Sequence, residues 1–297
     1  MDIRLYATVL KEGALLLEYG PVTMVLEAAR NGGPDTALAY LGAKSVLHHF
    51  ETLTTMLPAA KKMVPFHEGK DTAYPHVLQM MIHAVRALGE NDFTAMAAVA
   101  GTLSDLAVGE MAQAGAEYAM ANNGGDIAFR LSQTRKEIRV GIVSDLANGI
   151  PTYRLVIPYE SGITGVATSG FGGRSLTRGV ASAVTVMAKS SALADAAATS
   201  IANSCDVQDP AVQKCLAEEI DYDTDIRGLS VTRAIGNMSD EAIAHALMSG
   251  AERASELCSR DMIEGAVLFV AGRMELRWRG KAMPFSLEKL SSYKDRE

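Results

Sequence analysis

The chain has 297 residues, a formal net charge of −7 and a hydrophobic fraction of 48%. No run of Lys or Arg exceeds two residues, so the charge pattern excludes a nucleic-acid-binding surface. The three cysteines lack CxxC spacing, which excludes a disulfide framework and a zinc site of that type.

The first third of the chain predicts a β-hairpin followed by helices. The opening segment, "MDIRLYATVL", lacks the apolar stretch of a secretory signal, and no later segment has the roughly 20 apolar residues of a membrane span. We therefore expect a cytoplasmic protein with no membrane partner. Residues 3–26 read as two β arms around the turn "KEG". Helical spacing of apolar residues follows over 35–63, with a break at Pro58, and again over 75–88 and 93–115.

The middle of the chain predicts a meander, in which consecutive strands are joined by polar turns. The last third predicts both strands and helices. The expected strands lie at 116–131, 137–143, 152–159, 165–170 and 181–189, before an alanine-rich helix at 192–203. An Asp followed by Pro predicts a helix over 209–220. A strand at 228–236, a helix at 239–260 and a hairpin at 265–280 complete the pattern, and the tail from about 286 to 297 is expected to fray.

This order of elements favours an α+β fold, with an antiparallel sheet covered by helices, over a doubly wound parallel sheet. Two similar halves are expected, although no internal repeat is evident. The whole chain, 1–297, is predicted to form one domain.

The alanine-rich helix carries two residues that helix propensity does not explain. Asp195 and Thr199 are both poor helix formers and lie four residues apart, so they share one helix face with Ser191. Carboxylate and hydroxyl oxygens suit Mg²⁺, which keeps water or phosphate as its other ligands. The alternative is that both side chains hydrogen-bond locally within a packed helix, and spacing alone favours this second interpretation.

Two further segments are candidates for binding an anion or a ring. The turn "NNGGDIA", residues 122–128, can expose successive backbone N–H groups, although Asn-Gly and Gly-Gly are also common hairpin turns. Residues 161–179 are rich in Gly, Ser and Thr and carry Arg174 and Arg178, which suits phosphate. This segment matches neither a P-loop nor GxGxxG.

Taken in order, "MAAVAG", "NNGGDI", "TSG" and "VTVMAKSSALADAAATSI" resemble the ApbE-like superfamily, which includes FAD:protein FMN transferases, and in particular an uncharacterised branch of it. The resemblance implies a T-fold-like architecture. It also implies that Asp195 and Thr199 bind Mg²⁺ together with a backbone carbonyl near Gly101. The residues implied to border a flavin nucleotide are Asn123, Gly124, Gly125, Asp126, Thr168, Ser169 and Gly170, with Arg174 as a phosphate contact.

The chain departs from the transferases at two motifs. "GGRSLTRG" replaces their "HIIDP" run, and "AGTLSD", with Ser104, replaces a Lys-bearing helix. The resemblance therefore implies binding of FAD or a related flavin nucleotide with Mg²⁺ and an enzyme acting on its phosphoryl or pyrophosphate end, while the departures argue against FMN transfer. The alternative is a non-catalytic accessory protein of a metabolic pathway such as sulfur assimilation. A homo-oligomer is compatible with either interpretation.

Overall fold

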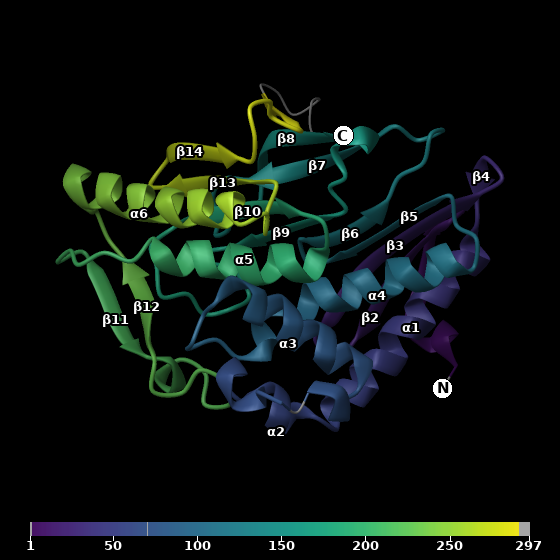
Figure 1. Cartoon of the computed structure of the whole chain (residues 1–297), viewed down its shortest axis with the longest axis horizontal. Coiled ribbons are helices and arrows are strands. Elements are labelled where there is room, and N and C mark those ends of the chain that lie inside the picture. Colours follow the sequence, from purple (N-terminus) through teal and green to yellow (C-terminus); the bar gives the residue numbers. More distant parts are fainter. Residues whose placement is uncertain (1, 70, 291–297) are drawn as a thin grey trace.

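The protein is built around one large antiparallel sheet (Figure 1). The computed structural model describes residues 2–69 and 71–290. The strands follow in the order β1 (Ala7–Lys11), β2 (Ala14–Tyr19), β3 (Val22–Arg30), β5 (Tyr118–Asn123), β6 (Asp126–Arg130), β9 (Gly165–Ser169), β10 (Ala183–Ala188), β13 (Gly265–Val270) and β14 (Arg273–Trp278), with the short β4 (Gly33–Pro34) paired to β3. This arrangement confirms the predicted antiparallel sheet flanked by helices.

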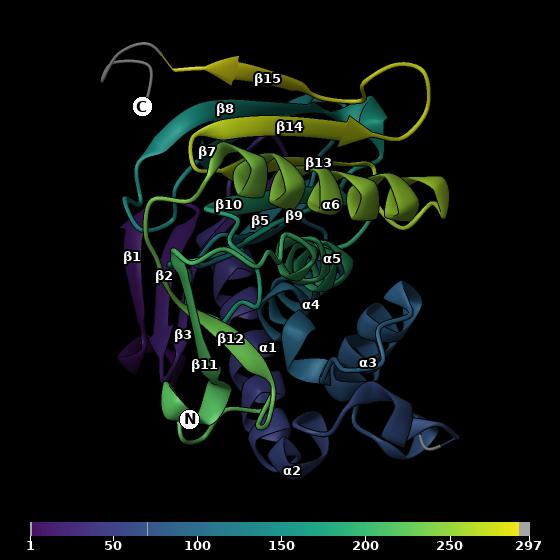
Figure 2. The same cartoon turned by 90° about the vertical axis from the view of Figure 1, so that its left-hand side faces the viewer.

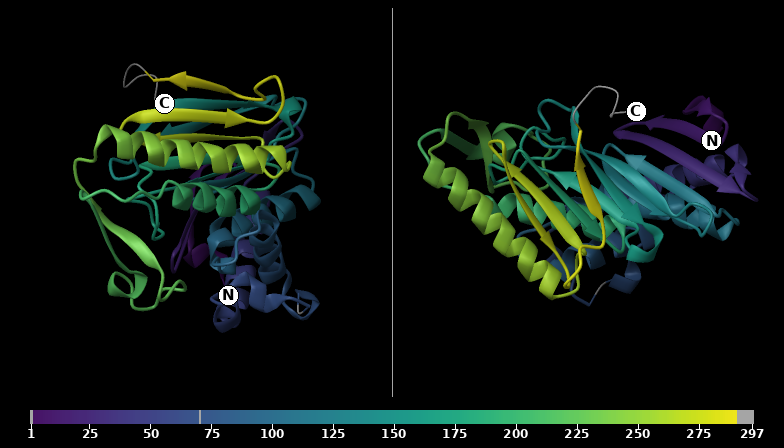
Figure 3. Two further views of the ribbon diagram at one scale, coloured as in Figure 1. Left: turned by 60° about the vertical axis from the view of Figure 1, so that its left-hand side comes forward. Right: turned by 90° about the horizontal axis from the view of Figure 1, so that it is seen from above.

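Helices cover one face of the sheet (Figures 1 and 3). The α-helices are α1 (Thr36–Thr54), α2 (Leu57–Ala60), α3 (His76–Leu88), α4 (Val99–Gln113), α5 (Ser191–Ser204) and α6 (Asp240–Ser259). Short 3-10 turns lie at η1 (Ile3–Leu5), η2 (Val64–His67), η3 (Asp71–Ala73), η4 (Ala95–Ala98), η5 (Tyr159–Ser161) and η6 (Ala217–Glu219). Helices α1, α4, α5 and α6 contact the strands, and α3 packs outside α4 and α5.

A second, three-stranded sheet packs on the opposite face (Figure 2). It consists of β15 (Ser286–Lys289), β8 (Pro151–Pro158) and β7 (Glu137–Val143), in that order. Ile138, Val140 and Leu155 from this sheet join Phe129 and Val267 of the main sheet in one hydrophobic core. Every residue of β10 and β13 is buried, because both faces of these central strands are covered.

A two-stranded arm projects from the helical side of the molecule. It is formed by β11 (Val212–Leu216) and β12 (Ser230–Ile235), and we call residues 217–229 between them the arm tip. In Figure 2 the arm runs from the end of α5 toward α2. Lys61 holds the tip there, since its Nζ lies 2.8 Å from Asp223 Oδ1. The arm therefore closes one side of the space beside α4 and α5.

Helix α5 is anchored at its first turn by a clamp from α4. The Ser190 hydroxyl caps the helix by accepting a hydrogen bond from the N–H of Leu193. The carboxylate of Asp105 accepts the N–H groups of Ser191 and Ala192 at 2.9 and 2.8 Å. These bonds satisfy N–H groups that have no partner within the helix.

The Asp105 clamp makes stability depend on pH. Burial raises the pKa of Asp105 to about 6 against 3.8 for an ordinary Asp, so the folded state holds this proton more tightly than the unfolded chain. The resulting stabilisation is complete below about pH 4 and is lost as the pH rises through 6, with an upper limit of about 3 kcal/mol. We expect the free energy of unfolding of Asp105→Asn, measured in urea at pH 4 to 7.5, to fall less over this range than that of the wild type. Parallel profiles would contradict this expectation.

Most predicted helices are present near their predicted bounds, but the opening segment differs. Three strands replace the predicted two arms, because the chain turns again at Gly20, whose φ is +57°. The predicted meander is also wrong: β7 and β8 leave the main sheet for the second one, and β6 pairs directly with β9.

The predicted helix over 209–220 is a strand followed by a short turn. Asp209 does accept the N–H of Ala211, as an N-terminal cap would. The next residues nevertheless pair with β12, and this non-local pairing overrides the local helix-start signal.

The expected frayed tail is wrong at its start, since Ser286–Lys289 forms β15 and pairs with β8. Residues 291–297 lie outside the described part of the chain. The T-fold-like topology, the two similar halves and the single domain stay predictions. Over residues 2–69 and 71–290, no helix combines the length and apolar character needed to cross a membrane.

Candidate functional site

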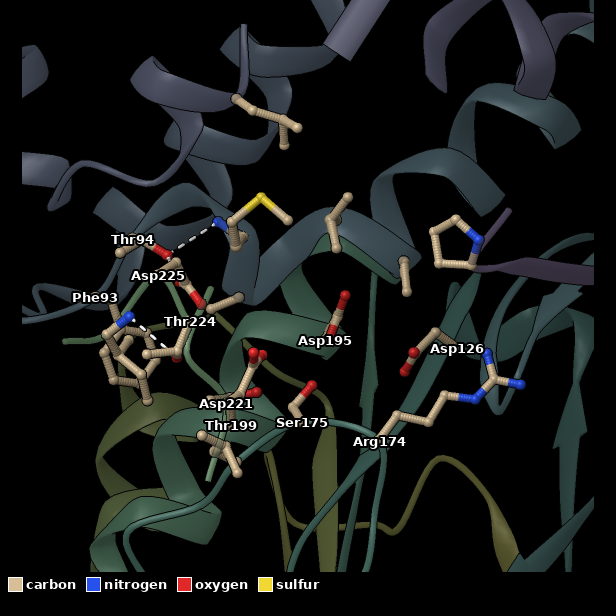
Figure 4. Close-up of a pocket in the computed structure, with 18 of the residues that line it drawn as sticks. Phe93, Thr94, Asp126, Arg174, Ser175, Asp195, Thr199, Asp221, Thr224 and Asp225 are labelled. Atoms are coloured by element: carbon tan, nitrogen blue, oxygen red, sulfur yellow. Dashed lines mark hydrogen bonds between the residues drawn. The ribbon is translucent and has the colours of Figure 1, made fainter. Parts of the chain in front are cut away.

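A cavity of about 490 Å³ lies between the β5–β6 turn, helices α4 and α5, and the arm tip. Apolar side chains from α1, η4 and α4 form much of its wall. The polar and charged side chains that line it are Thr54, Asp92, Thr94, Asn123, Asp126, Arg174, Ser175, Arg178, Asp195, Thr199, Asn203, Asp221, Thr224 and Asp225. Figure 4 shows Asp126 and Arg174 at one end, and Asp221, Thr224 and Asp225 at the other.

Asp195 lies on the cavity side of α5, between these two ends (Figure 4). Its Oδ2 accepts the N–H of Gly101 at 2.9 Å, and the N–H of Ala100 also bonds to the carboxylate. Burial, followed by the nearby charge of Asp126, raises the pKa of Asp195 well above its ordinary value. A cation at this position would favour the charged form of the carboxylate.

Asp126 is the first residue of β6 and faces the same cavity. The Ser104 hydroxyl donates to the Asp126 carbonyl at 2.8 Å, which ties α4 to the start of this strand. Burial raises the pKa of Asp126 to about 7, although the N–H of Thr168 and the charge of Arg174 act in the opposite direction. The cavity thus holds two neighbouring carboxylates whose pKa values are raised mainly by burial.

The glycine turn before β6 positions Arg174. Gly124 has φ +68°, and a Cβ built on it would lie 2.7 Å from Cζ of Arg174. A side chain at this position would collide with the guanidinium as well as strain the backbone. Gly124 therefore lets Arg174 lie against the turn and beside Asp126.

Asn123 contributes an amide to the cavity. The residue as a whole is only 5% exposed, yet it lines the cavity wall. Its side chain makes no hydrogen bond to any residue in the described part of the chain. The amide atoms are not among the fully buried atoms without a partner, so they keep access to the cavity and are available to a ligand.

The structure brings only part of the predicted site together. Asn123, Asp126, Arg174, Asp195 and Thr199 line the cavity. Their binding roles stay predictions.

The remaining residues of the predicted flavin border lie elsewhere. Gly124, Gly125 and Thr168 line a second cavity of about 530 Å³, which also touches β7. Ser169 and Gly170 line neither cavity. Gly170 instead allows close packing, since its Cβ would lie 2.9 Å from the Ala181 carbonyl oxygen.

The expected metal-binding carbonyl near Gly101 stays a prediction. The group of Gly101 that faces Asp195 is its N–H. A Cβ on Gly101 would lie 2.2 Å from the carbonyl oxygen of Ser191, so this glycine allows α4 to pack closely against α5. Ser191, on the same predicted strip, is fully buried and does not line the cavity.

Sequence reasoning missed the arm tip. Asp221, Thr224 and Asp225 reach the cavity because the Thr94 hydroxyl donates to Asp225 Oδ2 and Lys61 pairs with Asp223. The acidic run "DYDTD" is visible in the sequence, but nothing local connects it with residues more than 100 positions away.

The acidic groups are too few for an all-protein metal cage. Within residues 2–69 and 71–290, no cluster of three or more His, Cys, Asp or Glu side chains is placed to hold a metal ion. A cation at Asp195 would complete its shell with hydroxyl, water or phosphate oxygens, which is the pattern that Mg²⁺ tolerates.

Comparison with known proteins gives matches over most of the chain. Residues 7–276 match the family described as "AbpE bacteria". A UPF0280 protein of Methanosarcina barkeri is 39% identical over 140 residues, which are 47% of this chain and 53% of that protein. One of Methanococcus vannielii is 36% identical over 173 residues, or 57% and 66% of the two chains. The matched part of this chain spans about half the length of the first such relatives.

Two solved structures are similar at low identity. The flavinyl transferase ApbE of Pseudomonas stutzeri matches with a TM-score of 0.49 and 13% identity, covering 94% of this chain and 96% of that one. The flavin transferase ApbE of Vibrio cholerae matches with a TM-score of 0.48 and 11% identity, covering 90% and 96%.

Proposed function

This chain belongs to the AbpE bacteria family, within the ApbE-like superfamily, and from that premise we propose that it binds a flavin or related nucleotide with Mg²⁺ in the cavity beside α5. One observation carries the proposal. Asn123, Asp126, Arg174 and Asp195 come from segments up to 72 positions apart in the chain, yet they line one partly enclosed, mainly apolar cavity. Such a cavity, with a few converging polar groups and raised pKa values, is typical of a ligand site.

The end of the cavity that holds Arg174 suits phosphate. Its guanidinium offers a fork of donors that matches phosphate oxygens. Asp126 lies at this end and Asp195 lies between the two ends, so a phosphate group beside Arg174 is close to two carboxylates and needs a further positive charge. This requirement supports a divalent cation as part of the bound ligand.

Asp195 and Thr199 are the residues that would hold Mg²⁺, with Asp126 next to them. Their oxygens are the hard donors that Mg²⁺ prefers. Burial and the charge of Asp126 disfavour the charged form of Asp195, and a cation beside it would favour that form. Bound Mg²⁺ would neutralise charge on the phosphate oxygens. Arg174 would orient the phosphates, and the apolar wall would exclude water from the ring.

The departures from the transferase motifs limit the proposed chemistry to the phosphoryl or pyrophosphate end. Ser104 stands where the transferases carry a Lys, and its hydroxyl is already bonded to the Asp126 carbonyl. FMN transfer to a protein is therefore not part of the proposal.

Calorimetric titration of the full chain with FAD, FMN and ADP, in MgCl₂ or in EDTA, tests the binding proposal. We expect at least one nucleotide to bind in MgCl₂ and to bind about tenfold or more weakly in EDTA. The proposal fails if none of the three binds in MgCl₂ at millimolar concentration.

A non-catalytic binding protein is the second candidate. Among the described residues that line the cavity there is no His, Cys or Lys, the residue types that most often act as general base or nucleophile. Mass spectrometry after prolonged incubation with FAD and MgCl₂ separates the two candidates. Released AMP or FMN indicates an enzyme, and unchanged FAD that still binds indicates a binding protein.

Removal of the guanidinium should weaken phosphate binding selectively. We expect Arg174→Gln to lower the affinity for FMN about 10- to 100-fold, since a charge-assisted hydrogen bond is lost, but to change riboflavin affinity less than threefold. Calorimetry with both ligands measures the difference. Arg139→Gln is the control, because Arg139 pairs with Glu137 outside this cavity. An equal loss for FMN and riboflavin would contradict the assignment of Arg174 to phosphate.

A further inference from the structure

We propose, resting on the nucleotide-binding function above, that Asp221 and Asp225 of the arm tip recognise the hydrogen-bond donor edge of a planar nitrogen heterocycle. The arm tip would then determine which ring the site accepts.

The charge at the arm-tip end is uncompensated. Asp92 pairs with Arg178, and Asp223 pairs with Lys61. No cation in the described part of the chain pairs with Asp221 or Asp225. A phosphate group at this end would meet unpaired negative charge, so phosphates belong at the Arg174 end and the neutral part of the ligand belongs here.

Both carboxylates are held in place and keep a free oxygen. The Thr94 hydroxyl donates to Asp225 Oδ2, which leaves Oδ1 without a described partner. Asp221 Oδ1 accepts the N–H of Asp223 at 3.0 Å, which leaves Oδ2. The bond from Thr94 sets the position of Asp225 before a ligand arrives, whereas Asp221 is exposed and is held only by the backbone of its own turn. Both oxygens favour a ligand with N–H donors, and Asp225 is the more rigid acceptor.

The wall beside these acceptors is apolar and partly aromatic. Phe93 is only 5% exposed and lines the cavity next to Thr224 (Figure 4). Met96 and Leu229 also line this part of the wall. Aromatic and apolar side chains pack well on the face of a planar ring while leaving its edge to the carboxylates.

Asn123 points to a ligand independently of the acidic residues. The residue is 5% exposed, its amide is open to the same cavity, and the amide has no partner among the described side chains and backbone groups. Asn123 pairs with Asp126 across the β5–β6 turn, so it belongs to the Arg174 end of the cavity. A ligand that offers both donors and acceptors would satisfy it. The imide N–H of a flavin and the amino group of a purine both provide the donor edge that the arm tip requires.

Ring probes without phosphate test this proposal separately from nucleotide binding. Fluorescence or calorimetric titration compares riboflavin with 3-methylriboflavin, and adenosine with N6,N6-dimethyladenosine, on the full chain. We expect methylation to weaken one of the two pairs about 10- to 100-fold, as expected when a hydrogen bond to a charged group is lost. The affected pair identifies the ring as flavin or purine.

Variants assign the effect to the arm tip. We call the affinity for the unmethylated ring divided by that for the methylated ring the methylation ratio. This ratio should fall toward 1 in Asp225→Ala and in Asp221→Ala. Circular dichroism melting checks that each variant is folded. Glu219→Gln is the matched control, since Glu219 lies on the same tip but does not line the cavity, and a Gln oxygen can still accept the N–H of Leu216. It should keep the wild-type ratio.

The proposal is overturned if methylation changes neither pair, if none of the rings binds, or if the ratio is unchanged in both alanine variants. A different result would contradict the proposed function alone. In that case the wild-type protein binds none of FAD, FMN and ADP in MgCl₂, but still binds one ring more tightly than its methylated form.

Discussion

Asp195→Asn is expected to lower Mg²⁺-dependent nucleotide affinity by about 100-fold or more without lowering the stability of the metal-free protein. Loss of one charged partner at a desolvated site costs about 2–5 kcal/mol in binding. The free energy of unfolding of the metal-free protein should not fall, because burial and Asp126 already disfavour the charged carboxylate. An Asn oxygen can still accept the N–H of Gly101. Calorimetry in MgCl₂ measures affinity, and urea unfolding in EDTA at pH 7.5 measures the free energy of unfolding.

Asp209→Asn is the matched control for this variant. Asp209 also accepts two backbone N–H groups, those of Ala211 and Ser239, but it lies outside the cavity, and these bonds lower its pKa. Its substitution should reduce stability and leave nucleotide affinity unchanged. If Asp195→Asn keeps the wild-type dependence on Mg²⁺, Asp195 does not hold the cation.

Gly101→Ala is expected to destabilise the protein by about 3 kcal/mol or more. The new Cβ would lie 2.2 Å from the Ser191 carbonyl oxygen and 2.8 Å from the backbone nitrogen of Ala192. Overpacking of a core typically costs about 1–3 kcal/mol, and here the obstacle is helix backbone, which cannot rotate away as a side chain can. Urea unfolding gives the free energy, and a shift of α4 away from α5 should also weaken nucleotide binding.

Gly109→Ala on the same helix separates packing from helix propensity. A Cβ at Gly109 meets nothing within 4 Å. This variant should therefore gain about 0.5–1 kcal/mol from the better helix propensity of Ala. Similar effects from both substitutions would show that the contact between α4 and α5 does not depend on Gly101.

Gly101 and Gly109 show what the local sequence of this protein can predict and what it cannot. Both lie in one predicted helix, and that helix is present, but no local pattern distinguishes the glycine that contacts α5 from the one that faces open space. The difference arises from the packing of α4 on a helix about 90 positions later in the chain.

In the candidate site, too, the local features could be predicted from the sequence and the contacts between distant segments could not. The "NNGGDIA" turn and the Asp195–Thr199 spacing are local features, so the sequence could place them on a hairpin and on one helix face. The sequence did not show whether the turn and the helix face lie together. In the fold they do, because β6 and α5 are in contact. The fold also placed Gly124 at the edge of the second cavity, whereas its neighbour Asn123 lines the first.

By itself, the sequence determined the elements whose signals are short-range: the capped helices, the hairpin turns, the alanine-rich composition of α5, and the motifs of an ApbE-like chain. Only the tertiary structure decided that residues 212–216 form a strand, that the N–H of Gly101 bonds to Asp195, and that Asp221 and Asp225 reach the cavity. The physical reason is that strand pairing, helix contacts and the assembly of a cavity join distant segments. Their free energies therefore depend on partners that no local window of sequence contains.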